Sequence, residues 1–287
     1  MSRCDRYNKD SKVADFLVIA NKRSGSSWLN RNLSEQPDIF VTDKKGAHFF
    51  DLHFEEGLEF YSRFFQDADI SQLKGETEHS YFWDDLVPER IHSTLGPIPM
   101  LLTLRHPVDR AWSYFQLTRR FQPNNTDDFE KKFMDSMKKN DNMFAWGLYG
   151  KQIRKYLNYF PPEVFHYIRF DDIIDRPLET TQDTYRFLKL DPGFVPPSLN
   201  KKWTAATNID AHVPEVLQYM YYTSLFSNLT RRALRRIGFK NIVVYRAHSP
   251  PLYETLKRDL TMHYDEDIEL LIKLTGLDFS SWLSTSI

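Results

Sequence analysis

Cysteine is nearly absent from this chain, because the 287 residues include only Cys4, which lies in a polar N-terminal tail. A single cysteine excludes a disulfide framework and a cysteine-rich zinc site. The chain also has no run of about 18 apolar residues, and residues 1–15 contain no apolar segment of the kind found in a signal peptide. These absences predict a cytoplasmic protein without a membrane span.

An excess of charge of one sign is missing as well. Lysine and arginine together number 38, aspartate and glutamate together 39, and the formal net charge is -1. Such a chain has no general attraction to nucleic acid, so any site for an anion must be local. We therefore expect a small-molecule partner and no nucleic acid, while the sequence makes no prediction of the number of subunits.

A polar loop with cations and hydroxyls follows the first apolar run of the chain. Residues 22–29 read Lys-Arg-Ser-Gly-Ser-Ser-Trp-Leu, and they lie between the apolar run 16–20 and a segment in which Leu29 and Leu33 are four residues apart. This order predicts a strand, a tight loop and a helix. Backbone N–H groups at a helix N-terminus attract anions. The loop is a candidate anion site, and the alternative is a serine-rich turn that binds nothing.

The loop does not have the Walker A sequence of ordinary kinases and ATPases, which is Gly-x-x-x-x-Gly-Lys-Ser/Thr. Ser26 stands where the lysine belongs, and no glycine lies five residues before Gly25. A second apolar run, residues 98–104, does not end in the aspartate that a Walker B strand uses for Mg²⁺. A nucleotide kinase is therefore disfavoured.

This second apolar run is typical of a buried parallel strand, and it leads directly into Arg105. Pro107 suits the first turn of a following helix, which would place Ser113 in its second turn. A guanidinium and a hydroxyl at such a place can bind a phosphate. We interpret Arg110 instead as a structural residue that pairs with an acidic neighbour.

Two more segments place titratable groups near expected strand ends. His48 comes shortly after the candidate strand 39–42, and Glu76, Glu78 and His79 belong to the extended segment 75–82. Ligands of open α/β sheets lie beyond the carboxyl ends of the strands, so these side chains are candidate proton acceptors. The alternative is that residues 75–82 are turn residues, which cap neighbouring elements and face the solvent without a chemical role.

Taken together, residues 23–29 and the pattern Arg105-x-Pro-x-x-Arg-Ala-x-Ser113 resemble the sulfotransferases that use 3′-phosphoadenosine 5′-phosphosulfate (PAPS). The first stretch resembles the loop that binds the 5′-phosphosulfate in that family, and the second resembles the motif for the 3′-phosphate. The resemblance covers most of the chain apart from residues 210–250. It includes His48-Phe-Phe-Asp51 and residues 75–82, 167–172 and 274–282.

The resemblance implies an α/β fold of the P-loop-like sulfotransferase type, with a central, mostly parallel sheet flanked by helices and a nucleotide across the carboxyl ends of the strands. We expect residues 1–287 to form a single domain, with residues 210–250 as a helical insertion or a lid over the acceptor site. The implied enzyme moves a sulfuryl group from PAPS to a hydroxyl or amine of a small-molecule acceptor, such as a specialised metabolite or a carbohydrate. It releases adenosine 3′,5′-bisphosphate (PAP) and needs no metal. The alternative is a protein that binds PAP or PAPS without catalysis, or a scaffold.

The cofactor site implied by the resemblance combines the loop, the second motif and a basic pair near Trp203. That pair has a second interpretation as a solvated surface pair. The predicted residues are Lys22, Arg23, Ser24, Gly25, Ser26, Ser27, Trp28, Arg105, Ser113, Lys201 and Lys202, of which Arg23 is also expected to contribute to catalysis.

The chain departs from the family pattern on the acceptor side. Many relatives carry a glutamate as general base two residues before the histidine, where this chain has Gly46, and a lysine where it has Thr77. Because glycine cannot accept a proton and histidine titrates near neutral pH, we predict His48 as the base. Glu78 and His79 are the reserve candidates. The alternative for His48 is a packed histidine that orients its loop.

Overall fold

The computed structural model describes residues 13–42, 46–119, 129–139, 141–199, 252 and 254–287. Its centre is one five-stranded sheet in the order β2-β3-β1-β4-β5, and all of the strand pairs in the described residues are parallel. The predicted α/β class with a mostly parallel sheet is therefore confirmed. The strands are β1 (Phe16–Ile19), β2 (Ile39–Val41), β3 (Leu73–Glu78), β4 (Met100–Leu104) and β5 (Phe165–Arg169).

The central strands explain why two apolar runs were readable in the sequence. Every residue of β1 and of β4 is buried, and Leu17 lies opposite both Met100 and Glu76 in the register of the sheet. A parallel strand covered on both faces needs apolar side chains in both directions, which gives a continuous run. β3 differs, because its polar residues end at Glu78, so the segment 75–78 forms a strand and the turn interpretation is wrong for it.

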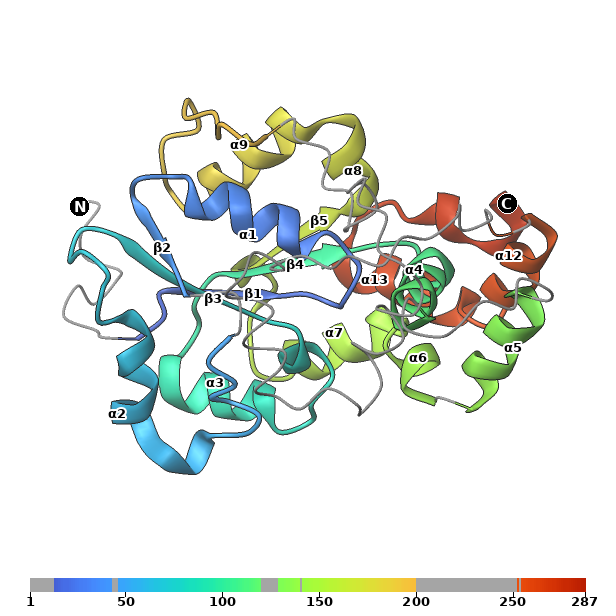
Figure 1. Ribbon diagram of the computed structural model, residues 1–287, viewed down its shortest axis with the longest axis horizontal. Helices are drawn as coiled ribbons and strands as arrows, with labels where there is room; N and C mark the ends of the chain where they lie inside the picture. Colours follow the sequence, from blue (N-terminus) through green and yellow to red (C-terminus); the bar gives the residue numbers. More distant parts are fainter. Residues whose placement is uncertain (1–12, 43–45, 120–128, 140, 200–251, 253) are drawn as a thin grey trace, which may run out of the picture.

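Helices cover both faces of the sheet, as Figure 1 shows. On one face, Leu29 and Tyr185 pack with Phe16 and Val18 of β1 in a single apolar cluster. Successive residues of a strand point to opposite faces, so Phe16 and Val18 serve the same side. The helices of this layer are α1 (Ser26–Ser34), α8 (Phe170–Asp175) and α9 (Pro177–Phe187).

The opposite face carries the larger apolar cluster. Leu17 and Ile19 of β1 pack there with Tyr61, Ile91 and Ile153 from three different helices. Phe49 and Phe50, which follow β2, and Tyr81 and Phe82, which follow β3, belong to the same cluster. Its helices are α2 (Gly57–Ser62), α3 (Val87–Leu95) and α7 (Tyr149–Leu157).

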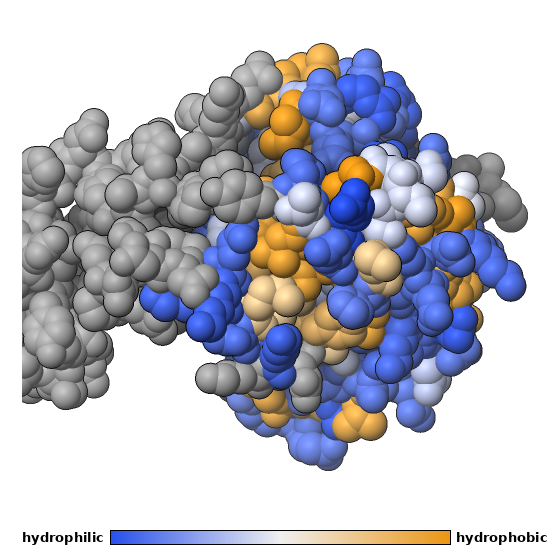
Figure 2. Space-filling view, turned by 90° about the vertical axis from the view of Figure 1, so that its right-hand side faces the viewer, coloured by the Kyte–Doolittle hydropathy of each residue, from blue (hydrophilic) through white to orange (hydrophobic). Residues whose placement is uncertain are grey.

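The remaining helices gather at one end of the sheet in Figure 1. The carboxylate of Asp267 accepts hydrogen bonds from the N–H groups of Gly150 and Lys151, which ties the C-terminal helices to the start of α7. Figure 2 looks onto this end and shows hydrophobic residues gathered among hydrophilic ones. The helices are α4 (Pro107–Arg119), α5 (Phe129–Lys139), α6 (Asp141–Ala145), α12 (Glu254–Thr261) and α13 (Asp265–Thr275). Short 3-10 turns are η1 (Phe54–Glu56), η2 (Arg63–Phe65), η3 (Ser80–Phe82), η4 (Pro162–Val164), η5 (Ser280–Trp282) and η6 (Ser284–Ser286).

Some sequence predictions fall outside the part of the chain that the structure describes. The helical insertion or lid at residues 210–250 and the basic pair Lys201 and Lys202 belong to this group. They and the single-domain prediction for residues 1–287 stay predictions. Within the described residues, no helix is both long enough and apolar enough to cross a membrane.

Candidate active site

The loop between β1 and α1 lies at the carboxyl end of the central strand and has an unusual backbone. Gly25 has a φ of 105° and Arg23 a φ of 76°. A Cβ atom on Gly25 would lie 2.7 Å from Cδ1 of Ile173, so both the backbone conformation and the space require glycine here. The carbonyl of Gly25 then accepts the N–H groups of Trp28 and Leu29, and α1 begins. The predicted strand, loop and helix are confirmed.

Two of the predicted loop residues point into the protein. The hydroxyl of Ser24 donates to the carbonyl of Asn21 at 2.6 Å and lies 3.0 Å from Oγ1 of Thr103 on β4. The indole N–H of Trp28 donates to the carbonyl of Leu199 at 3.3 Å, and its ring belongs to the apolar cluster under α1. These side chains hold the loop in place, whereas Lys22 and Ser27 are exposed.

The two predicted anion motifs meet although they are far apart in the sequence. Nε of Arg23 donates to Oγ of Ser113 at 2.9 Å, and Nη1 of Arg105 donates to the backbone carbonyl of Arg23 at 3.2 Å. The carbonyl of Arg105 in turn accepts the hydroxyl of Tyr149 at 2.7 Å. The meeting follows from the topology, because β1 and β4 are neighbours and both loops leave their carboxyl ends.

The guanidinium of Arg105 lies in surroundings that suit an anion. Its Cζ atom is 4.3 Å from the ring centroid of Phe170, a cation–π contact. Burial lowers the pKa of Arg105, although the carboxylates of Asp109 and Asp171 oppose this shift. A negative ligand beside this group and beside Arg23 would offset the cost of holding two guanidinium groups together.

Arg110 has the structural role that its sequence context predicted, but with a different partner. Its side chain is fully buried, and Nη2 donates to the backbone carbonyl of Met143 at 2.5 Å. The prediction of a pairing with an acidic neighbour is therefore wrong. A backbone carbonyl of α6 takes the place of the carboxylate.

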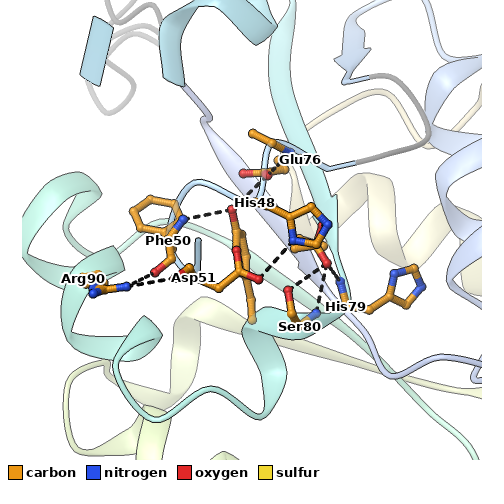
Figure 3. A network of polar contacts seen from close by, with 10 residues as sticks. His48, Phe50, Asp51, Glu76, His79, Ser80 and Arg90 are labelled. Carbon is orange, nitrogen blue, oxygen red and sulfur yellow. Dashed lines mark hydrogen bonds and ion pairs between the residues drawn. The ribbon is translucent and has the colours of Figure 1, made fainter. Parts of the chain in front are cut away.

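The acceptor-side candidates form one polar network, shown in Figure 3. Nδ1 of His48 lies 3.0 Å from Oδ2 of Asp51, and Nε2 of His48 lies 3.2 Å from Oε2 of Glu78. The imidazole of His48 is 40% exposed, so it is not simply packed in the core. Its backbone has a φ of 49°, in the left-handed region that non-glycine residues rarely adopt. His48 and Glu78 are thus in contact.

Glu78 ends β3 and is anchored by the turn that follows. Oε1 of Glu78 accepts the N–H of His79 at 2.7 Å, the N–H of Ser80 at 3.1 Å and the hydroxyl of Ser80 at 2.9 Å. The residue is only 5% exposed. The carboxylate therefore has one strongly held oxygen and one oxygen that faces His48.

His79 connects this network to the anion loop. Its Nε2 lies 2.9 Å from Oγ of Ser26, the first residue of α1. Burial lowers the pKa of His79, and the positive charge of Lys22 adds to this shift against the opposing effect of Glu78. The imidazole is therefore neutral at pH 7 and above. The predicted catalytic residues thus reach the same loop as the predicted cofactor residues.

Glu76, which the sequence offered with Glu78 and His79 as a potential proton acceptor, lies in the core and supports this network through hydrogen bonds. It is fully buried, and it accepts the N–H of Ala47 at 2.7 Å and the hydroxyls of Tyr61 and Tyr81 at 2.6 and 3.0 Å. Burial raises the pKa of Glu76 to about 7, while these hydrogen bonds oppose the shift. Its acidic side chain in the middle of an extended segment was the sequence feature that pointed to a special environment. Its contact with Ala47 fixes the backbone just before His48.

An aromatic cluster beside the loop was also missed. The rings of Trp83 and Trp146 stack with centroids 4.5 Å apart, and Tyr114 meets Trp146 edge-on at 5.4 Å. Nζ of Lys22 lies 5.8 Å from the ring centroid of Trp146. No sequence signal pointed to this cluster, because its members are distant along the chain. Among the described residues, no group of three or more histidine, cysteine, aspartate or glutamate side chains is arranged to hold a metal ion.

A family model and several known proteins match this chain. Residues 14–229 match the family model described as "Sulfotransferase domain". The heparan sulfate glucosamine 3-O-sulfotransferase 5 of Mus musculus is 29% identical over 185 residues, which are 61% of this chain and 53% of that protein. The chain thus spans about half the length of the curated relatives it matches.

Solved structures of similar fold have the same kind of name. A sulfotransferase from Alicyclobacillus acidocaldarius has a TM-score of 0.68 at 22% identity, covering 94% of this chain and 98% of its own. A mouse sulfotransferase complexed with PAP has a TM-score of 0.53 at 12% identity, covering 93% of this chain and 90% of its own. At these identities the likeness shows the fold.

Proposed function

Because this chain belongs to the sulfotransferase domain family, we propose that it transfers a sulfuryl group from PAPS to a hydroxyl or amine of a small-molecule acceptor and releases PAP. One observation carries the proposal: the hydrogen bond between Arg23 and Ser113 joins two candidate anion sites at the ends of adjacent strands. A nucleotide with phosphate groups at both its 5′ and 3′ positions needs two such sites. The complex of the mouse neighbour with PAP supports this choice of donor.

The 5′-phosphosulfate is assigned to the loop before α1. The N-terminal N–H groups of this helix, the guanidinium of Arg23 and the hydroxyls of Ser26 and Ser27 suit a tetrahedral anion. The exposed ammonium of Lys22 adds positive charge. Ser24, Gly25 and Trp28 belong to the proposed site as the residues that give the loop its shape.

The 3′-phosphate is assigned to Arg105 and Ser113. The guanidinium of Arg105 sits against Phe170 with its charge partly desolvated, which strengthens its attraction for an anion. Lys201 and Lys202 remain proposed contributors outside the described residues. A site of this kind should distinguish nucleotides that have the 3′-phosphate from those that lack it.

Sulfuryl transfer in line depends on positioning and on stabilisation of charge. Negative charge grows on the oxygen that leaves with PAP, and we assign its stabilisation to Arg23 and the N-terminus of α1, which adjoin each other in the loop. The acceptor must lose its proton as the new bond forms, so a proton acceptor must lie within reach. His48, Glu78 and His79 form the group from which we draw it.

The test is incubation of the full chain with ³⁵S-labelled PAPS and a panel of hydroxyl and amine acceptors. The panel begins with amino sugars and oligosaccharides, since the names of the curated relatives refer to glucosamine, and it continues with phenols, alcohols and amines. We expect label on at least one acceptor, identified by mass spectrometry. Tight PAP binding without transfer to any acceptor would contradict the proposal and support a nucleotide-binding or scaffold protein.

A further inference from the structure

Glu78 occupies the space that a side chain at position 46 would need. A Cβ atom built on Gly46 would lie 2.4 Å from Oε2 of Glu78 and 3.1 Å from its Cβ. Real Cβ atoms do not approach a neighbour to 2.4 Å, so a side chain at position 46 would require the carboxylate of Glu78 to move, and it would also lie 2.7 Å from the carbonyl of Thr77. Glycine at position 46 therefore leaves free the space that the carboxylate of Glu78 occupies.

The two oxygens of this carboxylate have different surroundings. Oε1 accepts three hydrogen bonds from the turn at His79 and Ser80. Oε2 has one contact among the described residues, with Nε2 of His48 at 3.2 Å, which is long for such a pair. A carboxylate oxygen has two lone-pair sites. Oε2 therefore has capacity to accept a further proton donor, and Oε1 does not.

The ring nitrogens of His48 and Nε2 of His79 already contact other side chains of the protein. Each ring nitrogen of His48 faces a carboxylate oxygen, from Asp51 on one side and Glu78 on the other. Both ring nitrogens of His48 are thus occupied by contacts with carboxylates, so neither faces the acceptor side unoccupied. His79 contacts Ser26 at the start of α1, in the loop to which the 5′-phosphosulfate is assigned.

The backbone of His48 is held in a strained conformation that preserves this contact. Its carbonyl accepts the N–H groups of Leu52 and His53, and the preceding N–H of Ala47 is bound by Glu76. From α3, Arg90 donates to the carbonyls of Phe50 and Asp51, as Figure 3 shows. Strain that a fold maintains in this way is common at functional sites.

We infer that Glu78 is the catalytic base of the proposed sulfuryl transfer, and that His48 and Asp51 are positioning residues which fix its carboxylate; the inference rests on the proposed function. As the acceptor oxygen or nitrogen bonds to sulfur, its proton passes to Oε2 of Glu78. The bond between sulfur and the 5′-phosphate oxygen breaks, and its electron pair leaves with PAP. Glu78 then returns the proton to water.

The first test uses Glu78→Gln in the full chain, with labelled PAPS and an acceptor identified from the panel. Glutamine keeps an oxygen for the N–H groups of His79 and Ser80 but has no basic carboxylate. We expect kcat to fall on the order of a hundredfold, with PAP affinity within about twofold of the parent chain. The matched control is Glu59→Gln, which changes an exposed carboxylate on α2 and should leave kcat unchanged.

Two outcomes of this test separate the two claims. If Glu78→Gln has the same turnover as the Glu59→Gln control, Glu78 is not the base and the inference is overturned while the proposed function stands. If the unmodified chain binds PAP and transfers sulfuryl to no acceptor, the proposed function fails, and the role of Glu78 fails with it.

A second variant tests whether Glu78 accepts a proton or only holds the turn that follows β3. Glu78→Gly empties the space beside Gly46, and formate is a carboxylate small enough to enter it. We expect formate to raise the turnover of Glu78→Gly by about tenfold or more, and to have no effect on the parent chain. PAP binding by the variant confirms that it is folded. A folded variant whose turnover does not respond to formate would limit Glu78 to holding the turn and would overturn the inference.

Discussion

Glu76 is a carboxyl group whose ionisation should be visible in the stability of the protein. Its hydrogen-bond partners are the N–H of Ala47 and the hydroxyls of Tyr61 and Tyr81, and burial raises its pKa from 4.5 to about 7. A folded-state pKa above the unfolded value gives stability that is fully present below pH 4.5. That contribution is lost as the pH rises through about 7.

The raised pKa of Glu76 predicts how the stability of Glu76→Gln should differ from that of the parent chain. The amide has no charge to desolvate, so the variant should gain free energy of unfolding relative to the parent chain as the pH rises from 4.5 to 8, by about 3 kcal/mol. Urea unfolding of both chains at a series of pH values measures the difference. A difference that does not change with pH would contradict the raised pKa.

Arg23 is the residue for which we expect the largest loss of turnover in the loop. Its guanidinium already spans from the loop to Ser113, and removing one donor to developing charge costs about a hundredfold or more in kcat. Arg23→Ala is compared with Arg63→Ala, an exposed arginine on η2. If Arg23→Ala keeps the turnover of that control, the loop has no part in the transfer.

Arg105 should determine selectivity for the 3′-phosphate. A charge-assisted pair in a desolvated setting is worth about 1.5–3 kcal/mol, so PAP should bind the parent chain on the order of a hundredfold more tightly than adenosine 5′-monophosphate. Arg105→Ala should remove most of this preference, whereas Arg186→Ala, at an exposed arginine of α9, should keep it. Calorimetric titration with both nucleotides measures the ratio. Equal affinities in the parent chain would contradict the assignment.

At the scale of elements, the loop that carries His48 packs closely against the strand β3 at Gly46. Gly46→Ala brings a methyl group within 2.4 Å of Oε2 of Glu78 and 2.7 Å of the carbonyl of Thr77. We expect a loss of about 1–3 kcal/mol in the free energy of unfolding. Gly193→Ala is the control, because its Cβ would meet only the end of the Asp191 side chain, at 3.2 Å.

The same substitution in a second background makes the test specific. In Glu78→Gly the carboxylate is gone, so Gly46→Ala should cost less there than in the parent chain, although the contact with the carbonyl of Thr77 remains. Thermal or urea unfolding of the four chains gives the coupling energy. Strictly additive costs would show that Glu78 does not lie against Gly46 in solution.

The elements differ in how far their sequences predicted them. β1 and β4 were predictable because a strand buried on both faces must be apolar throughout, and the topology then placed Arg23 and Arg105 at one edge. β3 was not recognised as a core strand, because Glu76 and Glu78 are polar residues whose partners come from elsewhere in the chain. Such partners depend on tertiary contacts that a local pattern does not contain.

At the scale of the whole molecule, a ligand that contacts the loops after both β1 and β4 should stabilise the entire fold. Binding to the folded state alone adds free energy in proportion to the logarithm of ligand concentration. At about a hundred times Kd, PAP should raise Tm by roughly 5 °C or more, because a few kcal/mol shift a protein of this size by that amount. Differential scanning calorimetry with PAP and with adenosine 5′-monophosphate at the same concentration tests this. A Tm that PAP leaves unchanged would contradict binding to the folded chain.

The space shared by Gly46 and Glu78 also constrains how this site can change by mutation. A side chain at position 46 costs stability while position 78 carries glutamate, and the nearby carbonyl of Thr77 adds to that cost. A lineage that moves its carboxylate from one position to the other therefore loses the least stability if it passes through an ancestor that has it at neither. The two positions should consequently covary among descendants of such an ancestor, with the charge found on one side of the space or the other and not on both.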